Sequence, residues 1–195
     1  SGKQGYEIAK SLAKAGIKTT LVSGVVDLNP VSGLKIIKVI TAKEMFDAVK
    51  KILPVDIAVC TAAVSDFRPK FFSKNKLKKN EKLLKFIELE KNQDILEFLG
   101  KNNRFRPKIL VGFSAETNNL FKNSLEKLKQ KHCDLIVANK VGDKTTGFNK
   151  DFNKVTIIDS NGKFKKIKKN HKSYIASILS GLIFSKFLNN DKNLN

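Results

Sequence analysis

Short apolar runs alternate with stretches of helical periodicity along most of the chain. Five runs are brief, continuously apolar and bounded by polar residues or glycine, at residues 19–23, 36–40, 56–62, 108–113 and 134–138. Such runs are typical of strands that are buried on both faces of a parallel sheet. We therefore expect each of the five to form a buried β-strand.

Helical patterns fill the intervals between these strands, at residues 6–15, 41–53, 93–99 and 118–131. The first stops at Gly16, a residue type that commonly ends helices. The second begins with Thr41 as its cap and has Glu44 at the capping-box position. We expect Gly100 to close the third. The alternation predicts βαβ units, and hence a Rossmann-like α/β fold with a mostly parallel sheet and helices on both faces.

The carboxyl-terminal part has a different pattern. Residues 155–159 and 164–168 flank a Ser-Asn-Gly turn, which predicts a β-hairpin. A helix is expected over residues 173–188, and its apolar stripe indicates core packing. The first helix of the chain has no strand before it, although a doubly wound fold needs one. We therefore expect a single domain over residues 1–195 whose amino-terminal strand and Gly-rich loop lie outside this sequence.

The composition adds a strong positive charge to this picture. The formal net charge is +20 and the pI is near 9.9, and nucleic acid or anionic lipid is the usual partner of such a charge. Lysine and asparagine are abundant everywhere, however, whereas arginine is scarce. We therefore attribute most of the charge to solvated surface and expect neither nucleic acid nor a membrane as partner.

Cysteine usage and hydropathy bear on the location of the protein. Cys60 and Cys133 are too few for a disulfide framework and fit reduced thiols. No signal peptide opens the sequence, and the longest apolar stretch, residues 174–188, is interrupted by serines and a lysine. We expect a cytoplasmic protein that does not span a membrane.

Polar residues at the carboxyl ends of the strands are candidate ligand contacts, because open parallel sheets bind ligands there. At the end of the strand at 56–62, Ala62 and Ala63 allow close approach to the backbone, and Asp66 supplies an acceptor for a base, a ribose or a metal. The alternative is an ordinary loop capped by Asp66. Phe113, at the end of a later strand, is suited to stacking on a sugar or base, or else belongs to the core.

Two sets of lysines are candidates for phosphate binding. Lys127 and Lys131 are four residues apart on one helix face, where two ammonium groups can converge on a phosphate. A solvated helix face is the alternative. Residues 68–82 carry six lysines and few apolar anchors. This segment is either a mobile lid over a triphosphate or a disordered loop.

Generic catalytic signatures are absent from the sequence. It contains no P-loop, no Gly-x-Ser-x-Gly elbow and no His/Cys set with metal-ligand spacing. The Gly-rich opening at residues 1–5 precedes a helix, so its free amides are able to hold a phosphate or carboxylate.

Taken together in order, several short segments resemble the synthetase domain of bacterial phosphopantothenoylcysteine synthetases. They are Ser-Gly-Lys-Gln-Gly at 1–5, Thr-Leu-Val-Ser-Gly at 20–24, Ala-Ala-Val-Ser-Asp-Phe at 62–67, Lys-Leu-Lys-Lys at 76–79, Asn-Gln-Asp-Ile at 92–95, Val-Gly-Phe-Ser-Ala-Glu-Thr-Asn at 111–118, Asp-Leu-Ile-Val-Ala-Asn at 134–139 and Gly-Phe at 147–148. The resemblance covers nearly the whole chain, up to the final helix.

The resemblance implies a ligase that joins 4′-phosphopantothenate to cysteine in coenzyme A biosynthesis. The carboxylate of phosphopantothenate attacks the α-phosphate of CTP, pyrophosphate leaves, and the amino group of cysteine then displaces CMP from the acyl-cytidylate. Mg²⁺ accompanies CTP. The family further implies a homodimer, and FMN only where a decarboxylase domain is fused outside this chain.

The resemblance also implies roles for individual residues. By this resemblance, Ala62, Ala63 and Asp66 border the cytosine and the acyl-nucleotide, and Gly2 and Ala62 lie on the substrate side. Lys76 is the lid lysine that stabilises the α-phosphate transition state. The nucleotide pocket is lined by Asn92, Asp94 and Phe113, and the phosphates are held by Lys127 and Lys131. No metal ligands are assigned.

The sequence departs from the family pattern in three places. The upstream Gly-rich segment, which carries an important asparagine, is absent. The Asn-Pro-Asp motif has Gln93 in place of proline, and Lys140 replaces the aspartate that usually follows Ala-Asn.

Two other functions fit parts of the pattern. An NAD(P)-dependent reductase shares the βαβ units, but no Gly-x-Gly-x-x-Gly run is present, and Gly24 follows its strand without the expected acid. A basic nucleic-acid-binding module would use the net charge of +20. It requires aromatic residues among the lysines, and only Phe71 and Phe72 meet this condition.

Overall fold

The computed structural model describes residues 1–73, 75–76, 86–142, 147 and 150–192. The helices are α1 (Lys3–Lys14), α2 (Ala42–Ile52), α3 (Ile95–Lys101), α4 (Leu120–Gln130) and α5 (Lys172–Lys192). The strands are β1 (Thr20–Ser23), β2 (Lys35–Lys38), β3 (Ile57–Cys60), β4 (Phe67–Pro69), β5 (Leu89–Lys91), β6 (Ile109–Glu116), β7 (Leu135–Lys140), β8 (Phe152–Asp159) and β9 (Phe164–His171).

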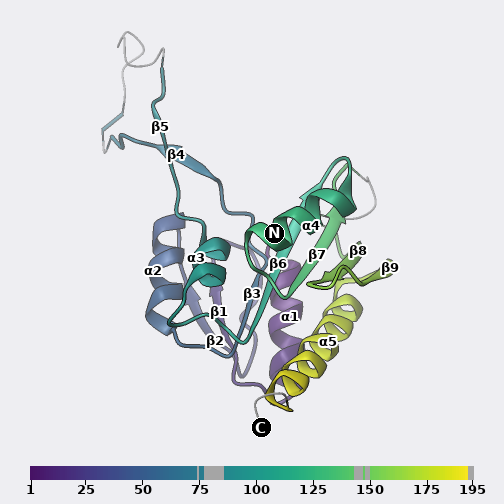
Figure 1. The fold of residues 1–195 in the computed structure, drawn as a ribbon. Helices are drawn as coiled ribbons and strands as arrows, with labels where there is room; N and C mark the ends of the chain where they lie inside the picture. Colours follow the sequence, from purple (N-terminus) through teal and green to yellow (C-terminus); the bar gives the residue numbers. More distant parts are fainter. Residues whose placement is uncertain (74, 77–85, 143–146, 148–149, 193–195) are drawn as a thin grey trace.

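The strands form one large sheet and two small ones (Figure 1). The large sheet has the order β3-β6-β7-β8-β9, in which β3, β6 and β7 are parallel and the β8–β9 hairpin adds two antiparallel strands. The strands β1 and β2 pair in parallel with each other, and β4 pairs with β5 in antiparallel fashion. All five strands expected from the apolar runs are present, and their pairings with one another are parallel. The predicted α/β class is confirmed.

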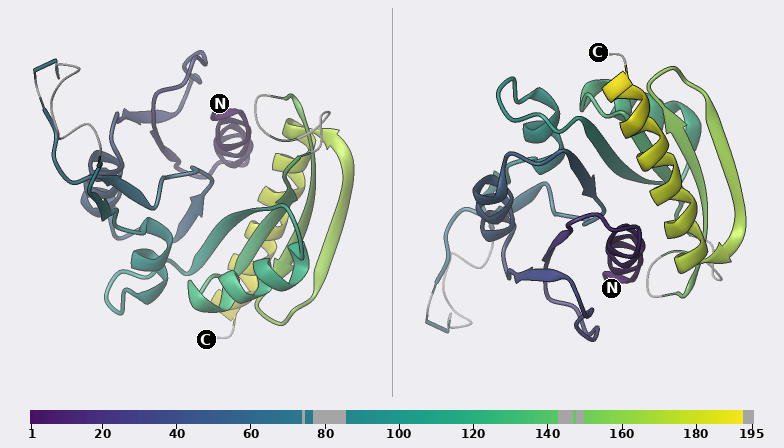
Figure 2. Two further views of the ribbon diagram at one scale, coloured as in Figure 1. Left: turned by 90° about the horizontal axis from the view of Figure 1, so that it is seen from above. Right: turned by 90° about the horizontal axis from the view of Figure 1, so that it is seen from below.

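Helices cover both faces of the large sheet, as predicted (Figure 2). Because side chains alternate along a strand, Ile109 and Val111 of β6 pack against α1 and α5, whereas Leu110 packs on the opposite face against α3 and α4. In α5, Ile175 and Leu179 have no exposed surface and join the first of these clusters. The apolar stripe of the last helix therefore packs in the core, as expected.

Local sequence explains where the first two helices begin and end. The amide of Gly16, with φ of 80°, donates to the Ala13 carbonyl, and the amide of Ile17 donates to the Leu12 carbonyl, which together end α1. The Thr41 hydroxyl accepts from the Glu44 amide at the start of α2. Both boundaries agree with the sequence prediction.

The prediction that Gly100 closes the third helix is wrong. Residue 100 lies inside α3, which continues to Lys101. A β-carbon at this position would lie 1.9 Å from the Lys131 carbonyl oxygen, so glycine is needed for the close approach of the α4 C-terminus. The helix instead begins at Asp94, whose side chain caps it by accepting from the Glu97 amide.

The sequence did not indicate the β4–β5 ribbon. Together with the adjoining described residues 70–73 and 86–88, β4 and β5 form an arm that projects from the body (Figure 1). Ion pairs join Arg68 to Glu90 at 2.8 Å and Lys70 to Glu88 on the same face. The first residues of the expected lid, 68–82, thus belong to the arm, and residues 74 and 77–82 lie outside the described residues.

Candidate functional site

A cavity of about 660 Å³ lies at the carboxyl end of β3 and continues between β1 and β3. Six residues singled out from the sequence line it: Ala62, Asp66, Asn92, Asp94, Phe113 and Lys127. They come from the loop after β3, the segment before α3, the middle of β6 and the last turn of α4. Four separate elements thus contribute to one site, which we call the site cavity.

Asn92 holds the loop after β3 against the base of the arm. Its side-chain amide donates to the Ser65 carbonyl at 2.8 Å, and its backbone amide donates to the Asp66 carbonyl at 2.8 Å. Its side-chain oxygen accepts from Arg68 at 2.7 Å. The side chain of Asn92 is therefore engaged in positioning this loop, and the Asp66 carboxylate is left exposed.

Lys131 joins α3 to the end of α4. Its ammonium lies 3.0 Å from an Asp94 carboxylate oxygen and 2.9 Å from a Glu97 oxygen. Hydrogen bonds from Lys101 and Lys131 lower the pKa of Glu97 from 4.5 to about 2. Burial lowers the pKa of Lys131, but the bonds to Glu97 and Asp94 outweigh burial, and the net pKa is raised. We call this group the carboxylate clamp.

Lys127 occupies a different position from Lys131, although the two lie one turn apart. Its ammonium donates to the Phe113 carbonyl at 3.0 Å and lines the site cavity. The Phe113 ring packs partly against the core cluster formed with α1 and α5. Lys127 therefore presents a positive charge to the cavity, while the charge of Lys131 is neutralised by carboxylates.

Four predicted residues do not line the site cavity. Ala63 is exposed on the loop after β3, and Lys76 is exposed in the short described segment 75–76 that follows the first strand of the arm. Gly2 caps α1 with φ of 67°, and a β-carbon there would lie 2.8 Å from Val26 Cγ1, so both the left-handed backbone and the close packing favour glycine. Lys131 is the fourth, held in the carboxylate clamp.

Two positioning residues were not identified from the sequence. Arg68 binds Asn92, and Glu97 binds Lys131. The spacing of Asp94 and Glu97 is that of a helix cap and its N3 residue, which was a usable signal for Glu97. Arg68 gave none, because its partner lies 24 residues away in sequence.

The donors near the cavity do not form a metal site by themselves. Among the residues that the structure describes, no three His, Cys, Asp or Glu side chains lie together in a metal-binding cluster. Mg²⁺ commonly keeps several waters and binds through one or two carboxylates together with substrate phosphates. Asp66 offers one exposed carboxylate in the cavity wall. The residues present therefore fit a nucleotide-bound Mg²⁺.

Of the two cysteines of the chain, Cys60 is partly buried and lines the site cavity, and Cys133 is buried. Burial raises the pKa of both Cys60 and Cys133 to about 12. Both are therefore neutral thiols at physiological pH, and a thiol is a poor nucleophile compared with a thiolate.

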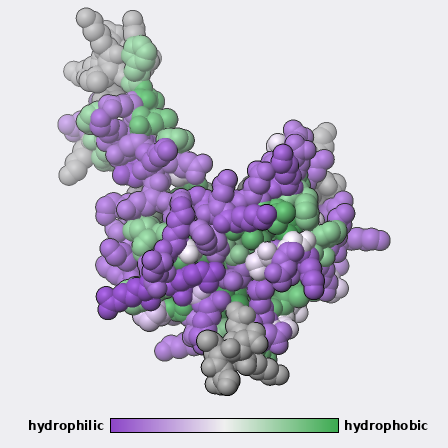
Figure 3. All heavy atoms as spheres, viewed as in Figure 1, coloured by the Kyte–Doolittle hydropathy of each residue, from purple (hydrophilic) through white to green (hydrophobic). Residues whose placement is uncertain are grey.

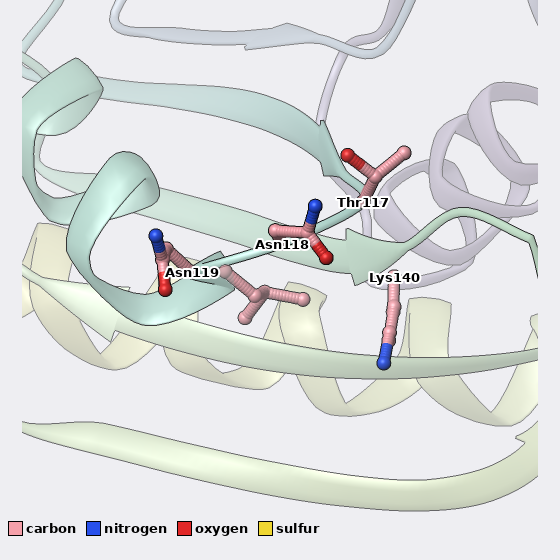
Figure 4. A pocket seen from close by; sticks show the side chains of 5 residues that line it. Thr117, Asn118, Asn119 and Lys140 are labelled. Atoms are coloured by element: carbon pink, nitrogen blue, oxygen red, sulfur yellow. The ribbon is translucent and has the colours of Figure 1, made fainter.

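A second hollow, of about 510 Å³, lies where β6 passes into α4. Thr117, Asn118, Asn119 and Lys140 line it (Figure 4). The side chains of Thr117 and Lys140 point in opposite directions, so they do not converge on one ligand position. Lys140, which departs from the family pattern, is an exposed side chain at the end of β7.

The fold and the site cavity define a Rossmann-like α/β domain with a cavity at the carboxyl edge of a parallel sheet. Residues 1–186 match the family described as DNA/pantothenate metabolism flavoprotein C-terminal domain, and the chain belongs to this family. In the described residues, no helix is long and apolar enough to cross a membrane.

Relatives of known name support this assignment. The chain is 35% identical over 186 residues to the coenzyme A biosynthesis bifunctional protein CoaBC of Borreliella burgdorferi, covering 94% of the chain and 46% of that protein. It is 40% identical over 164 residues to CoaBC of Bacillus subtilis, covering 83% of the chain and 40% of that protein. The chain thus spans less than half the length of these relatives.

A solved structure agrees with the sequence comparisons. The crystal structure of the C-terminal domain of a CoaBC protein superposes with a TM-score of 0.78 at 32% identity. The match covers 98% of this chain and 84% of that one.

Proposed function

We propose that the chain is a phosphopantothenate–cysteine ligase of coenzyme A biosynthesis, driven by CTP. The chain is a member of this family, and its site cavity is lined by six of the residues that the resemblance associates with the nucleotide. This observation carries the proposal. The carboxyl edge of a parallel sheet is also where nucleotides bind in folds of this class.

The first step forms an acyl-cytidylate. The carboxylate of 4′-phosphopantothenate attacks the α-phosphorus of CTP, a new P–O bond forms, and the bond to the β-phosphate breaks to release pyrophosphate. Lys127 holds phosphate oxygens with its ammonium, and Phe113 packs on the nucleotide. Lys76, on the arm, moves over the cavity and stabilises the charge on the α-phosphate. Lysine is protonated at neutral pH and needs no activation for this role.

Small residues and Asp66 position the acyl group. Ala62 and Ala63 let the acyl-nucleotide approach the loop after β3, and Gly2 lies on the substrate side at the start of α1. The Asp66 carboxylate, which is exposed in the cavity wall, binds the ribose or base, or would help to hold a Mg²⁺ that accompanies CTP. Bound Mg²⁺ would neutralise charge on the departing pyrophosphate.

The second step forms the amide. The amino group of cysteine attacks the acyl carbon, the bond between the acyl carbon and the phosphate oxygen breaks, and CMP leaves. The proton lost from nitrogen passes to solvent or to the leaving group. The exclusion of water by the closed arm favours the amine over hydrolysis.

The test is product formation with CTP, Mg²⁺, 4′-phosphopantothenate and cysteine, repeated with ATP. We expect pyrophosphate, CMP and the coupled product in equal amounts, with CTP preferred. Lys127→Gln removes a charge-assisted contact worth about 1.5–3 kcal/mol, which raises the Kd for CTP roughly 10- to 100-fold. Lys129→Gln is the matched control, because Lys129 is an exposed lysine on the same helix outside the cavity. Equal affinities for the two variants would contradict the proposed site.

We infer further that two copies of the chain pair through the arm. Its apolar side chains Phe67, Phe71, Ile87 and Leu89 are 50–73% exposed, and Figure 3 shows apolar surface along the arm. An isolated two-stranded ribbon is marginally stable in water, so a covering surface is needed. A second copy presents the same apolar face, and a self-complementary contact is the usual form of a homodimer.

A further inference from the structure

The two lysines at the end of α4 have different partners, although both were expected to hold phosphates. Lys127 donates to the Phe113 carbonyl, an uncharged acceptor, so its positive charge remains at the cavity wall. Lys131 lies about one turn, or 5.4 Å, further along the helix. It is held by the carboxylates of Asp94 and Glu97 at 3.0 and 2.9 Å. The charge of Lys131 is therefore satisfied inside the protein before any ligand binds.

Lys131 is located directly behind the wall of the site cavity. Its partner Asp94 lines the cavity, whereas Lys131 and Glu97 do not. Both oxygens of Asp94 are engaged, because Oδ1 accepts from the Glu97 amide at 2.8 Å and Oδ2 lies 3.0 Å from the Lys131 ammonium. The Lys131 side chain keeps 20% of its surface exposed. Lys131 can therefore bind an anion in the cavity only when it gives up a carboxylate.

Glu97 is the carboxylate that can lose Lys131 and still be paired. Its Oε1 is bound by Lys101, one turn later in α3, and its Oε2 is bound by Lys131. A carboxylate that keeps one charged partner loses less free energy than one that is left without any. Lys101 therefore lowers the cost of releasing Lys131 from Glu97.

The four side chains are electrically balanced while Lys131 is held. Two carboxylates, of Asp94 and Glu97, face two ammonium groups, of Lys101 and Lys131. A triphosphate carries several negative charges, and its attraction to Lys131 is opposed by every carboxylate close to that lysine. Glu97 is thus a competitor of the phosphates for Lys131, although it lies outside the cavity.

We propose that Glu97 and Lys101 set the affinity of the site for the nucleoside triphosphate by controlling the release of Lys131. This assignment depends on the ligase function proposed above. In the free protein, Lys131 is bound by Asp94 and Glu97. When the triphosphate binds, Lys131 exchanges Glu97 for a phosphate oxygen, and Glu97 stays with Lys101. Glu97 therefore weakens nucleotide binding and Lys101 strengthens it, and both act through Lys131 as positioning residues.

Calorimetric titration with CTP and Mg²⁺ tests the proposal through the opposite signs of two substitutions. Glu97→Gln frees Lys131 from its competitor, so the Kd for CTP should fall about two- to fivefold, the range expected for one exposed ion pair. Lys101→Gln leaves Glu97 with Lys131 alone, so the Kd should rise by a similar factor. The controls are Glu126→Gln and Lys129→Gln, which make the same changes in net charge at exposed positions of α4 outside the cavity. Their effects should be smaller.

The double variant separates this exchange from a general effect of charge. Because Lys101 acts through Glu97, Lys101→Gln should change the Kd no more than Lys129→Gln does once Glu97→Gln is present. Long-range attraction predicts additive effects instead. In the ligase assay, Glu97→Gln should lower the KM for CTP and leave kcat unchanged, because Glu97 does not touch the reacting atoms.

The possible results distinguish this proposal from the ligase function on which it depends. A Kd for Glu97→Gln that is unchanged or raised, or additive effects in the double variant, would overturn the role of Glu97 and Lys101 and leave the ligase function intact. An unmodified chain that binds no CTP would contradict the ligase function, and this proposal with it. Thermal unfolding of each variant above the assay temperature confirms that the compared proteins are folded.

Discussion

Close packing of α3 against α4 depends on a single residue without a side chain. Gly100 lies where a β-carbon would meet the Lys131 carbonyl oxygen at 1.9 Å, a backbone atom that cannot turn aside. The contact brings the α4 C-terminus to the start of the site, where Lys131 binds Asp94. A residue that does not itself line the cavity thereby positions groups beside it.

Gly100→Ala should destabilise the protein, because the new methyl group forces α3 and α4 apart. Overpacking of this kind costs about 1–3 kcal/mol, which lowers Tm by several degrees in a chain of this size. Gly181→Ala is the control, because Gly181 is helical and a β-carbon there meets nothing within 4 Å. That change should raise stability by roughly 0.5–1 kcal/mol. Thermal unfolding of both variants measures the difference, and equal shifts would refute the packing argument.

At the scale of elements, the carboxylate clamp holds α3 to α4. Lys131 bridges Asp94 and Glu97, and Lys101 binds Glu97 from the next turn. In the absence of ligand, Lys131, which the family resemblance assigns to phosphate, is bound by the carboxylates of the clamp. A phosphate that binds Lys131 must therefore compete with these two carboxylates.

The clamp gives a specific dependence of stability on pH. The pKa of Glu97 is about 2 in the folded state and 4.5 without its partners. Because the pKa of Glu97 is lower in the folded state, the contribution of ionised Glu97 to folding stability is fully present above pH 4.5 and is lost as the pH falls towards 2. Urea unfolding between pH 6 and pH 2 should show a smaller loss of stability for Glu97→Gln than for the unmodified chain. Parallel curves for the two proteins would exclude the clamp.

Elements with strong local signals could be predicted from the sequence, whereas those that depend on distant partners could not. The apolar runs of β6 and β7, the Gly16 stop and the turn at Gly162 each have a local cause. The strands β4 and β5 are three residues each and pair across residues 70–88, so no periodicity marks them. Gly100 resembles a helix stop, and only the neighbouring helix explains it.

The same distinction applies to the site. Ala62 and Asp66 end or follow a predicted strand, so their place at the carboxyl edge could be anticipated. Phe113 was expected at the end of its strand, but β6 continues to Glu116, so Phe113 lines the cavity from mid-strand. The hydrogen bonds of Lys131 and Asn92 could not be predicted, because their partners Glu97 and Arg68 belong to other elements. Residue type and position indicate where a side chain lies, whereas its hydrogen-bond partner depends on tertiary packing.

At the scale of the whole molecule, the arm is the feature that most requires a partner. Its two faces differ: Arg68 and Glu90 form an ion pair on one face, and Phe67 and Leu89 are exposed on the other. The net charge of +20 opposes association of two copies, so apolar contact has to supply the attraction.

Leu89→Ser should weaken the dimer, because it removes apolar surface from the centre of the proposed contact. Truncation of a buried leucine at such a contact costs on the order of 2 kcal/mol, or roughly a 30-fold rise in the dimer Kd. Glu88→Ser is the control, because its side chain lies on the face with the ion pairs. Sedimentation equilibrium of the two variants measures the effect. If both variants dissociate equally, or the unmodified chain is monomeric, the arm is not the dimer contact.

The most direct test of the proposed ligase is detection of the acyl-cytidylate by mass spectrometry. The chain is incubated with CTP, Mg²⁺ and 4′-phosphopantothenate but without cysteine. The ligase proposal predicts a species with the mass of phosphopantothenate plus CMP less water, formed together with pyrophosphate and converted to the cysteine amide and CMP when cysteine is added. Absence of this species, or pyrophosphate release that does not require phosphopantothenate, would contradict it.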